Sequence, residues 1–380
     1  MRGRKLVAHL APDGPRFVAA VAAALDGGPA VLPVPPGPPG TVAALLAELR
    51  PDAVVDEAGR VTALPDPAPC ADEVAAVVVT SGSTGPPKGV ELPAAALRAS
   101  AVASLATLGA RPGARWLACL PLFHIAGLQV LVRALVGGTE PVLGPLGTEA
   151  AYTALVPTML YRALRDGVEL SHYDGVLVGG AAAAPDLLGR ARDAGVRVVT
   201  TYGMTETCGG CVYDGRPLPG VSCHLDADGR VRVSGAVVAR GYRRGALFHT
   251  VFRTHDLGRI WPDGRLEPLG RADEVIVTGG KKVHAQNVEA ALAGDPSVAA
   301  AFVAGIADPE WGRRITALVV PADERRPPTL AGLRRHLAAH GPGWTAPRAL
   351  HLLSDLPRLA SGKVDRRAAA ALLTHLENEQ

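Results

Sequence analysis

Hydroxyl groups, glycines and one lysine follow an apolar run in the N-terminal part of the chain. The β-branched run Val74–Val79 ends at Thr80, and Lys88 stands shortly after it between a proline and Gly89. Glycine lets a backbone approach a ligand closely, and successive N–H groups in such a turn form an anion-binding concavity. The stretch therefore predicts a polyphosphate site to which Lys88 adds a full positive charge. The residues assigned to this phosphate loop are Thr80, Ser81, Gly82, Ser83, Thr84, Gly85 and Lys88.

Other interpretations of the same loop are weaker. A Walker-type loop needs Ser or Thr directly after Gly-Lys, but Lys88 lies between Pro87 and Gly89. A hydrolase elbow needs G-x-S-x-G before a helix, whereas Ser83 lacks the first glycine and prolines follow it. A merely flexible Ser/Gly loop explains neither the run before it nor the lysine after it. A serine hydrolase using Ser83 and a degenerate nucleotide-binding protein remain as alternatives.

The loop resembles the phosphate-binding loop of the acyl-adenylate-forming superfamily, which contains acyl-CoA synthetases, luciferases and peptide-synthetase adenylation domains. Six more stretches resemble motifs of that superfamily and occur in its order along the chain. They are Gly179-Gly180-Ala181, Tyr202–Thr207, Thr254–Gly258, Gly270–Asp273, Gly279–Lys282 and Leu359–Asp365. A chance occurrence of so many motifs in order is much less plausible than a shared function.

The resemblance implies a site for ATP and Mg²⁺. Tyr202 would stack on adenine, which would lie against Gly179, Gly180 and Ala181. Thr205 would reach a phosphate, and Glu206 would help to hold Mg²⁺. The remaining residues implied are Gly203 beside both nucleotide and acyl group, Asp256 on the ribose hydroxyls and Arg271 near the ribose.

The resemblance also implies a second half-reaction with coenzyme A. Lys363 would supply the cationic charge for adenylation, and Asp273 would be the hinge about which a C-terminal lid rotates. In the second conformation the loop with Gly279 and Gly280 would line the pantetheine tunnel. Attack of a carboxylate on the α-phosphate brings two anions together, so positioning and cationic stabilisation are the catalytic needs.

Lysine is rare in this chain, which gives a check that does not depend on the resemblance. Five lysines stand against 34 arginines, the remainder of the 39 basic residues. Lys88 and Lys363 are nevertheless lysines, and a compact ammonium group on a flexible stem suits phosphate oxygens. Lys5 and the pair Lys281-Lys282 make up the rest.

The acyl substrate is predicted from the stretch Leu120–Gly127 and from Arg133. His124 lies in the acyl-pocket motif and is assigned to catalysis and substrate binding, and no Asp occurs there to hold an amino group. A buried Arg133 would bind a second carboxylate bidentately, and a solvated or phosphate-facing arginine is the competing interpretation. These points resemble bacterial o-succinylbenzoate–CoA ligases of menaquinone biosynthesis. A ligase for another aromatic or short-chain acid is the alternative.

The elements that must position these residues alternate between apolar runs and helices, which predicts an α/β fold. A helix is expected at Ala94–Leu108, and another after Thr41 as its N-cap. Glycine- and proline-punctuated strands after Val212 predict a β-rich subdomain. We expect residues 1–270 to form a large adenylating domain of layered α/β subdomains plus this β-rich subdomain. Residues 271–380 would form a small mobile α+β lid.

Bulk composition limits the partners. A formal net charge of +3 without a Lys/Arg block does not favour nucleic acid. No signal-type segment follows Met1–Lys5, and no run reaches the roughly 20 apolar residues of a membrane span. Cys208, Cys211 and Cys223 would suit a zinc or redox site, but small residues of a reducing cytosol are favoured. We expect a cytoplasmic enzyme whose partners are a small carboxylic acid, ATP and CoA, and we consider a homodimer.

Overall fold

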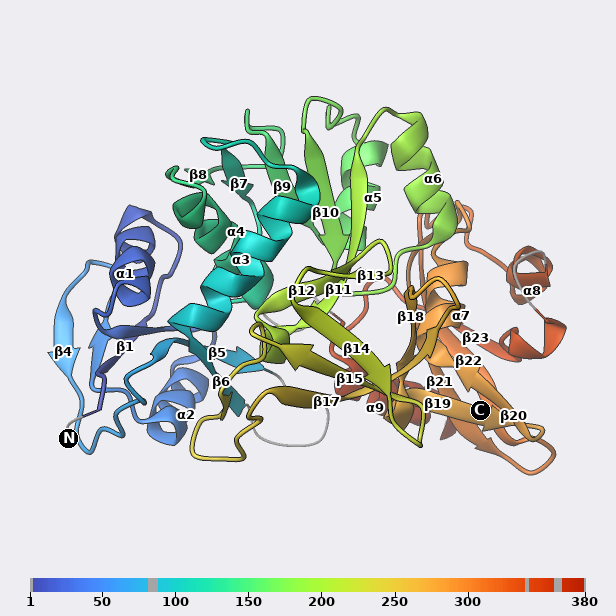
Figure 1. The fold of residues 1–380 in the computed structure, drawn as a ribbon. Helices are drawn as coiled ribbons and strands as arrows, with labels where there is room; N and C mark the ends of the chain where they lie inside the picture. The colour runs from blue at the N-terminus through green and yellow to red at the C-terminus, as the bar shows by residue number, and fades with distance from the viewer. Residues whose placement is uncertain (1–2, 81–87, 339–341, 359–363, 379–380) are drawn as a thin grey trace.

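The computed structural model describes residues 3–80, 88–338, 342–358 and 364–378. Two large sheets with helices between and around them form the N-terminal part, and a third sheet joins it to a group of C-terminal elements (Figure 1). The α/β class, the β-rich subdomain and the small α+β C-terminal unit expected from the sequence are confirmed.

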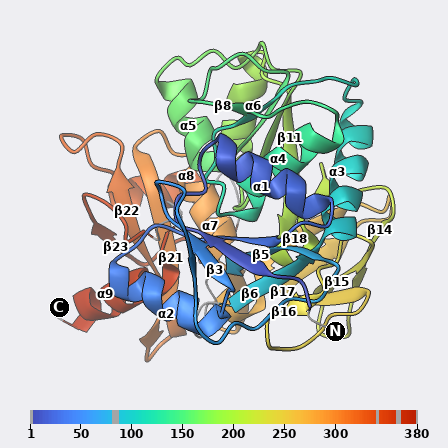
Figure 2. The same ribbon diagram turned by 90° about the vertical axis from the view of Figure 1, so that its left-hand side faces the viewer.

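Among the described residues, the first sheet contains seven strands in the order β16-β6-β5-β2-β1-β3-β4. Its strands are β1 (Leu6–His9), β2 (Ala30–Pro33), β3 (Ala53–Val55), β4 (Val61–Ala63), β5 (Val74–Thr80), β6 (Lys88–Pro93) and β16 (Gly241–Tyr242). The parallel pairs β1–β2, β1–β3 and β2–β5 form its interior, where continuous apolar runs are buried. Helices α1 (Pro15–Leu25) and α2 (Pro39–Leu49) accompany it. Helix α1 also contacts α4 (Ile125–Val136) of the next layer (Figure 2).

The second sheet also has seven strands, ordered β13-β12-β11-β10-β9-β7-β8. They are β7 (Trp116–Ala118), β8 (Val142–Leu143), β9 (Tyr152–Leu155), β10 (Gly175–Gly179), β11 (Val198–Met204), β12 (Gly209–Tyr213) and β13 (Arg216–Pro217). Its helices are α3 (Ala94–Leu108), α4 (Ile125–Val136), α5 (Pro157–Arg165), α6 (Pro185–Asp193) and the short η1 (Thr205–Thr207). Helices α3 and α4 pack together, and their buried leucines and alanines share one core with α1 and with β5 and β6.

The third sheet is antiparallel and leads into the C-terminal elements. It consists of β14 (Val221–Leu225), β15 (Arg230–Gly235), β17 (Val251–Ile260) and β18 (Leu266–Arg271). After η2 (Ala272–Glu274) come β19 (Val275–Thr278), β20 (Lys281–His284), α7 (Ala285–Leu292), β21 (Val298–Asp308), β22 (Gly312–Pro321), α8 (Leu330–Ala338), η3 (Gly343–Thr345), β23 (Ala349–Leu352) and α9 (Arg366–Asn378). These elements have their own buried core around Ile276, Leu292 and Ile315.

Two details of the sequence interpretation are corrected. Helix α2 begins at Pro39 with Pro38 as its N-cap, and Thr41 makes no cap, because a proline at the first helical position already has the required φ and no N–H to satisfy. Gly89 is not placed for ligand approach. It lies buried in β6, where a Cβ would come within 2.8 Å of side-chain atoms of Leu49 and Val77.

Within the described part of the chain, no helix has both the length and the apolar character that a membrane crossing requires. The cysteines are free thiols. Cys208 and Cys211 are buried in the main core, and burial raises the pKa of both thiols, that of Cys211 to about 12. A thiol in that environment stays protonated at neutral pH and is therefore a poor zinc ligand or redox nucleophile.

Candidate active site

The predicted phosphate loop connects two antiparallel strands. Strand β5 ends at Thr80, β6 begins at Lys88, and these two residues face each other in the ladder. Ser81, Gly82, Ser83, Thr84 and Gly85 lie outside the described residues. Because a strand follows the loop, neither the helix of a hydrolase elbow nor the helix dipole of a Walker loop is available here. The positive charge that this hairpin offers to a phosphate group is therefore that of Lys88.

The adenine and ribose candidates are already joined by a hydrogen bond. Tyr202 lies near the end of β11 and donates from its hydroxyl to Oδ2 of Asp256 on β17, at 2.7 Å. Burial, followed by the neighbouring Asp256 carboxylate, raises the pKa of the Tyr202 phenol, so this group remains a donor. Strands β10 and β11 are parallel, so Gly179, at the carboxyl end of β10, lies beside the carboxyl end of β11 that carries Tyr202. Gly180 and Ala181 follow at that end, where α/β sheets usually bind ligands.

Gly203 permits a close approach between two strands. A Cβ at this position would lie 2.1 Å from the carbonyl oxygen of Gly209 in β12. Real Cβ atoms do not come that close to a backbone oxygen, so a larger residue would force β11 and β12 apart. Gly203 thus has a packing requirement in addition to the ligand contacts predicted for it.

Glu206 is a half-buried carboxylate just after the end of β11. It lies in η1 with the buried Thr205, and Thr207 fixes the turn by accepting a 3.0 Å hydrogen bond from the Met204 N–H. Burial raises the pKa of the Glu206 carboxyl, and the phenol of Tyr242 donates to its Oε1 at 2.9 Å. A nearby cation would favour the charged form of such a carboxyl.

The residues here fit a bound Mg²⁺. Within residues 3–80, 88–338, 342–358 and 364–378, no group of three or more His, Cys, Asp or Glu side chains could hold a metal by themselves. Mg²⁺ commonly takes only one or two protein carboxylates and completes its coordination with substrate phosphates and water. The Glu206 carboxylate with Thr205 beside it supplies the oxygen ligands that such a mode needs.

Arg271 and Asp273 mark the passage from the third sheet to the C-terminal elements. Arg271 ends β18 opposite Asp256 in the strand register, and its guanidinium bonds Asp273 in η2. The next hairpin, β19–β20, turns at Gly279 and Gly280, whose φ values are +52° and +74°. Two successive positive φ values are what a tight hairpin turn of this kind requires. Lys363 lies outside the described residues.

His124 and Arg133 lie at opposite ends of α4. His124 is the N-cap residue, beside the Phe123 ring at 4.6 Å, and Arg133 is in the last turn. Nine residues of helix span about 13 Å, so the two side chains would contact different parts of a substrate. Only an elongated substrate, or one that shifts during the reaction, would reach both.

Arg133 is buried, with 3% of its surface exposed, which contradicts a solvated arginine. Its Nε donates to Ser104 Oγ at 2.9 Å, its Nη2 donates to Tyr213 OH at 3.1 Å, and the guanidinium stacks over Trp116. Nη1 is buried without a hydrogen-bond partner among the described residues. A bidentate grip on a carboxylate would require the Ser104 or Tyr213 bond to open, whereas a single bond from Nη1 is available directly.

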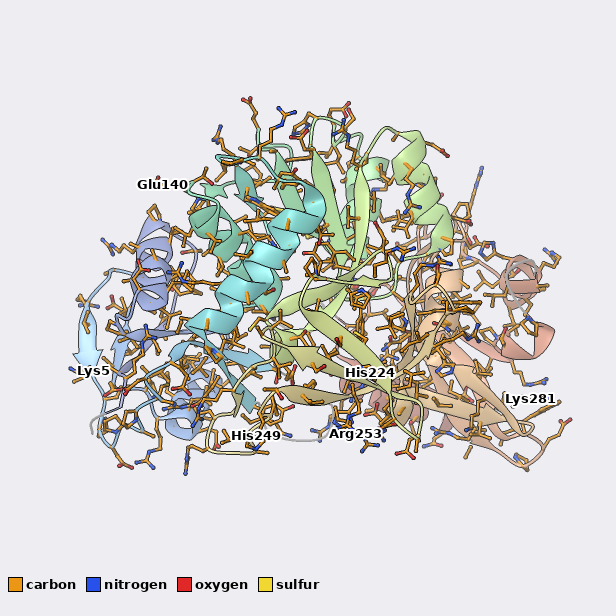
Figure 3. The ribbon with its side chains drawn as sticks, in the orientation of Figure 1. Lys5, Glu140, His224, His249, Arg253 and Lys281 are labelled. Carbon is orange, nitrogen blue, oxygen red and sulfur yellow. The ribbon has the colours of Figure 1, made fainter. Side chains whose placement is uncertain are left out.

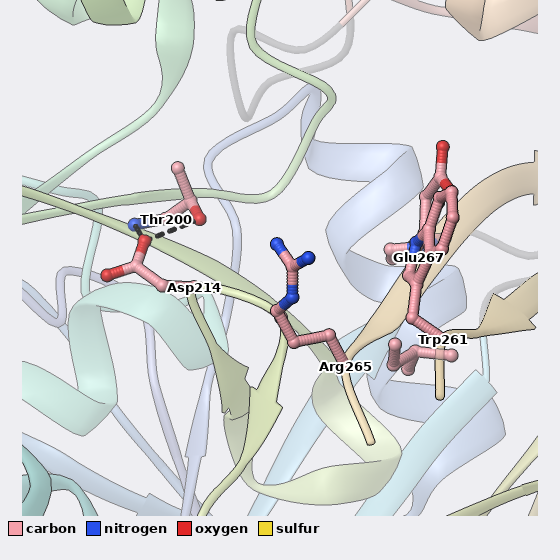
Figure 4. Close-up of a pocket in the computed structure, with 8 residues that line it drawn as sticks. Thr200, Asp214, Trp261, Arg265 and Glu267 are labelled. Carbon is pink, nitrogen blue, oxygen red and sulfur yellow. Dashed lines mark hydrogen bonds between the residues drawn. The ribbon is translucent and has the colours of Figure 1, made fainter. Parts of the chain in front are cut away.

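Lys5, Lys281 and one surface groove lie away from these residues (Figure 3). Lys5 and Lys281 lie toward opposite ends of the molecule (Figure 3). A groove of about 390 Å³ lies between the β17–β18 hairpin and the end of β12 (Figure 4). In it Asp214 accepts hydrogen bonds from Thr200, and the Trp261 indole donates to Glu267. None of the predicted site residues lines this groove.

The sequence did not reveal several residues on other helices and strands that contact the predicted site residues. Tyr242, Tyr213, Ser104 and Trp116 each contact a predicted site residue, yet each is far from it in the sequence. A single tyrosine or tryptophan carries no local signal of such a contact. The pairing of β16 with β6, and the packing of α3, β7 and β12 against α4, bring these groups together.

Comparisons with known proteins identify the family of the chain. The family model for AMP-binding enzymes matches residues 48–243, and the model for the C-terminal domain of these enzymes matches residues 287–363. A probable 2-succinylbenzoate–CoA ligase of Mycobacterium tuberculosis is 46% identical over 323 residues, 78% of this chain and 84% of that protein. A 2-succinylbenzoate–CoA ligase of Bacillus licheniformis is 32% identical over 340 residues, 78% of this chain and 69% of that protein.

Solved structures give the same result. The Bacillus subtilis o-succinylbenzoate CoA synthetase in complex with its acyl-adenylate intermediate superposes with a TM-score of 0.83 at 26% identity, covering 97% of this chain and 88% of that one. The same enzyme with ATP and magnesium ion gives a TM-score of 0.82 at 26% identity, covering 97% and 90%. By sequence and by fold, the chain belongs to the AMP-binding enzyme family.

Proposed function

We propose that this protein is an ATP- and Mg²⁺-dependent ligase that converts 2-succinylbenzoate into its CoA thioester, a step of menaquinone biosynthesis. The observation that carries the proposal is that Tyr202 bonds Asp256, while Tyr242 contacts both Glu206 and Lys88, in a member of the AMP-binding family. The choice of acid is supported by relatives that are named for this substrate, one of them 46% identical.

In the first half-reaction, a carboxylate oxygen of the acid forms a bond to the α-phosphorus of ATP. The bond from that phosphorus to the bridging oxygen of the β-phosphate breaks, and pyrophosphate leaves. Lys88, at the start of β6, is assigned to the pyrophosphate end of ATP, and Asp256 to the ribose hydroxyls. Mg²⁺, held by Glu206 with Thr205 beside it, would neutralise phosphate charge when bound.

Lys363 is assigned the catalytic charge of this step. Two anions react, so an ammonium group beside the α-phosphate lowers the barrier by stabilising the charge of the transition state. His124 is assigned to the reacting end of the acid at the start of α4. The buried Arg133 is assigned to the second carboxylate, which its unpartnered Nη1 supports.

In the second half-reaction, the CoA sulfur forms a bond to the acyl carbon and loses its proton to solvent. The bond from that carbon to the AMP oxygen breaks, and AMP leaves. The Gly279-Gly280 turn is assigned to the pantetheine arm, and Asp273 to the hinge that exchanges this turn for Lys363. The two family models leave residues 244–286 between them. A boundary at residues 270 and 271 falls inside that gap, which supports the division into an adenylating domain and a mobile lid. A cytoplasmic location and a homodimer stay predictions.

The test is a pyrophosphate-release screen over a panel of carboxylic acids, followed by mass spectrometry of the CoA products. The panel contains 2-succinylbenzoate, benzoate, a short-chain acid and a long-chain fatty acid. Release that depends on 2-succinylbenzoate, with its CoA thioester as product, is the expected result. Pyrophosphate release with another acid at a much higher kcat/KM would show that this acid, and not 2-succinylbenzoate, is the substrate. Labelling of Ser83 by a fluorophosphonate would support the hydrolase alternative.

A further inference from the structure

Tyr242 contacts both charged ends of the proposed phosphate site. Its hydroxyl donates to Oε1 of Glu206 at 2.9 Å. The ammonium group of Lys88 lies over the face of its ring, 4.9 Å from the centroid. The carboxylate assigned to the metal and the lysine assigned to pyrophosphate are thus connected by one side chain.

The surrounding structure fixes Tyr242 independently of any ligand. Tyr242 pairs with Val90 in the β16–β6 ladder, and the N–H of the next residue, Arg243, donates to the Gly89 carbonyl at 2.7 Å. The Phe248 ring meets the Tyr242 ring edge-on at 4.9 Å. The ring is therefore held in place by the same strand that carries Lys88.

The backbone of this segment also holds Glu206. The N–H of Ala239 donates to the carbonyl oxygen of Glu206 at 2.9 Å. Glu206 is thus attached to residues 239–242 at two points, once by its backbone and once by its side chain. The strand β16 aligns η1 with the start of β6, although these segments are more than a hundred residues apart in the sequence.

This arrangement has an electrostatic consequence. A lysine and a glutamate in direct contact would form an ion pair. That ion pair would have to break before either side chain could bind a ligand. The Tyr242 ring instead accepts Lys88 on its face through a cation–π contact. Its hydroxyl donates to Oε1 of Glu206 and so fixes the orientation of that carboxylate.

We propose that Tyr242 is a positioning residue that orients Glu206 toward the metal of a metal–ATP complex and holds Lys88 for its terminal phosphates. This inference rests on the proposed function for the identity of the nucleotide and the metal. It concerns ATP binding, which does not require the acid or CoA. Its failure and the failure of the proposed substrate are therefore distinguishable.

Calorimetric titration of the full-length protein with ATP, in the presence of Mg²⁺ and in the presence of EDTA, tests the proposal without turnover. Tyr242→Phe keeps the ring and removes the donor, so the factor by which Mg²⁺ tightens ATP binding should fall roughly tenfold, the scale of a lost hydrogen bond to a charged group. Its metal-free affinity for ATP should match the wild type. Tyr242→Leu removes the ring as well, so its metal-free affinity for ATP should also fall, by roughly threefold.

Tyr173→Phe is the matched control. Its hydroxyl donates to the Thr148 carbonyl at 2.9 Å in the core around α5 and α6, so the substitution removes a tyrosine hydroxyl hydrogen bond without touching the site. It should leave both ATP affinities unchanged. An unaltered Mg²⁺ effect in Tyr242→Phe would overturn the proposal. So would an equal loss of affinity with and without Mg²⁺, which would indicate a general structural role. Should Tyr242→Leu fail to fold, the Tyr242→Phe titration decides alone.

Discussion

Arg271 holds Asp273 through two hydrogen bonds, 2.9 Å from Nε to Oδ1 and 2.8 Å from Nη2 to Oδ2. The residue assigned to the neighbourhood of the ribose is thus bonded to the residue assigned to the hinge. A nucleotide that recruited this guanidinium would displace Asp273 from it. Nucleotide contact and the bend between β18 and β19 are therefore coupled through this ion pair, beside which Glu274 lies 3.9 Å from Arg271 Nε.

Asp273→Ala should tighten ATP binding, because it removes the carboxylate that competes for Arg271. The pair is partly exposed, with 27% and 39% of the side-chain surfaces accessible, so the gain is limited to about fivefold. Calorimetric titration with ATP measures it, and Arg271→Ala should weaken binding in the same assay. Weaker ATP binding by Asp273→Ala would contradict the competition between nucleotide and hinge.

Local patterns predicted most elements well. Helix α3 has the expected bounds, Ala94–Leu108, because its composition favours helix and its ends coincide with changes in pattern. The predicted start of α2 was wrong because Pro38 and Pro39 set the first turn of the helix more strongly than Thr41 does. Gly89 was assigned to ligand approach, whereas its lack of a side chain serves the packing of β6 against α2 and β5.

Site residues that belong to a motif were predictable, and their supporting contacts were not. The spacing Tyr202 to Glu206 is local, so it is visible in the sequence. The contact of Tyr242 with Glu206 depends on β16 pairing with β6, and that of Tyr213 with Arg133 depends on β12 packing against α3 and α4. Such long-range contacts form only when the whole chain has folded. They produce no residue pattern that could be recognised in one sequence.

Lys363→Ala should abolish adenylate formation and spare the second half-reaction. The lysine charge is needed where two anions meet at the α-phosphate, whereas thioester formation from supplied acyl-adenylate proceeds with the lid in its other conformation. Pyrophosphate release measures the first step, and CoA thioester formation from synthetic 2-succinylbenzoyl-AMP measures the second. Equal loss of both activities would argue against two conformations with separate roles.

Arg133→Ala should raise KM for 2-succinylbenzoate far more than KM for a monocarboxylate analogue that lacks the second acid group. The charged partner of that acid group is lost, and a hydrogen bond to a charged group is worth about 1.5–3 kcal/mol. Steady-state pyrophosphate release with both acids gives the comparison. Ser104→Ala is the control, because it removes one partner of Arg133 while leaving the guanidinium in place. Parallel increases in KM for the two acids would remove Arg133 from the acyl pocket.

Arg366 joins the segment after Lys363 to the hinge region. Its guanidinium bonds both oxygens of Glu289 in α7, at 2.8 Å and 3.0 Å, and its Nε contacts Glu274 of η2 at 2.7 Å. Glu289 is the more buried partner, with 14% of its side chain exposed. Burial raises the pKa of the Glu289 carboxyl, and Arg366 opposes that shift.

Arg366→Met should destabilise the C-terminal elements by about 3 kcal/mol at neutral pH, because an unpaired carboxylate remains buried. Without Arg366 the pKa of Glu289 rises further, so the folded state keeps a proton that the unfolded state has lost. The stability of the variant therefore falls as pH rises between the ordinary carboxyl value and this raised value, and its deficit should shrink near pH 5. Denaturant unfolding at both pH values measures this, with the exposed Arg367→Met on the same helix as control. A deficit that grows toward acidic pH would show that Glu289 does not carry the effect.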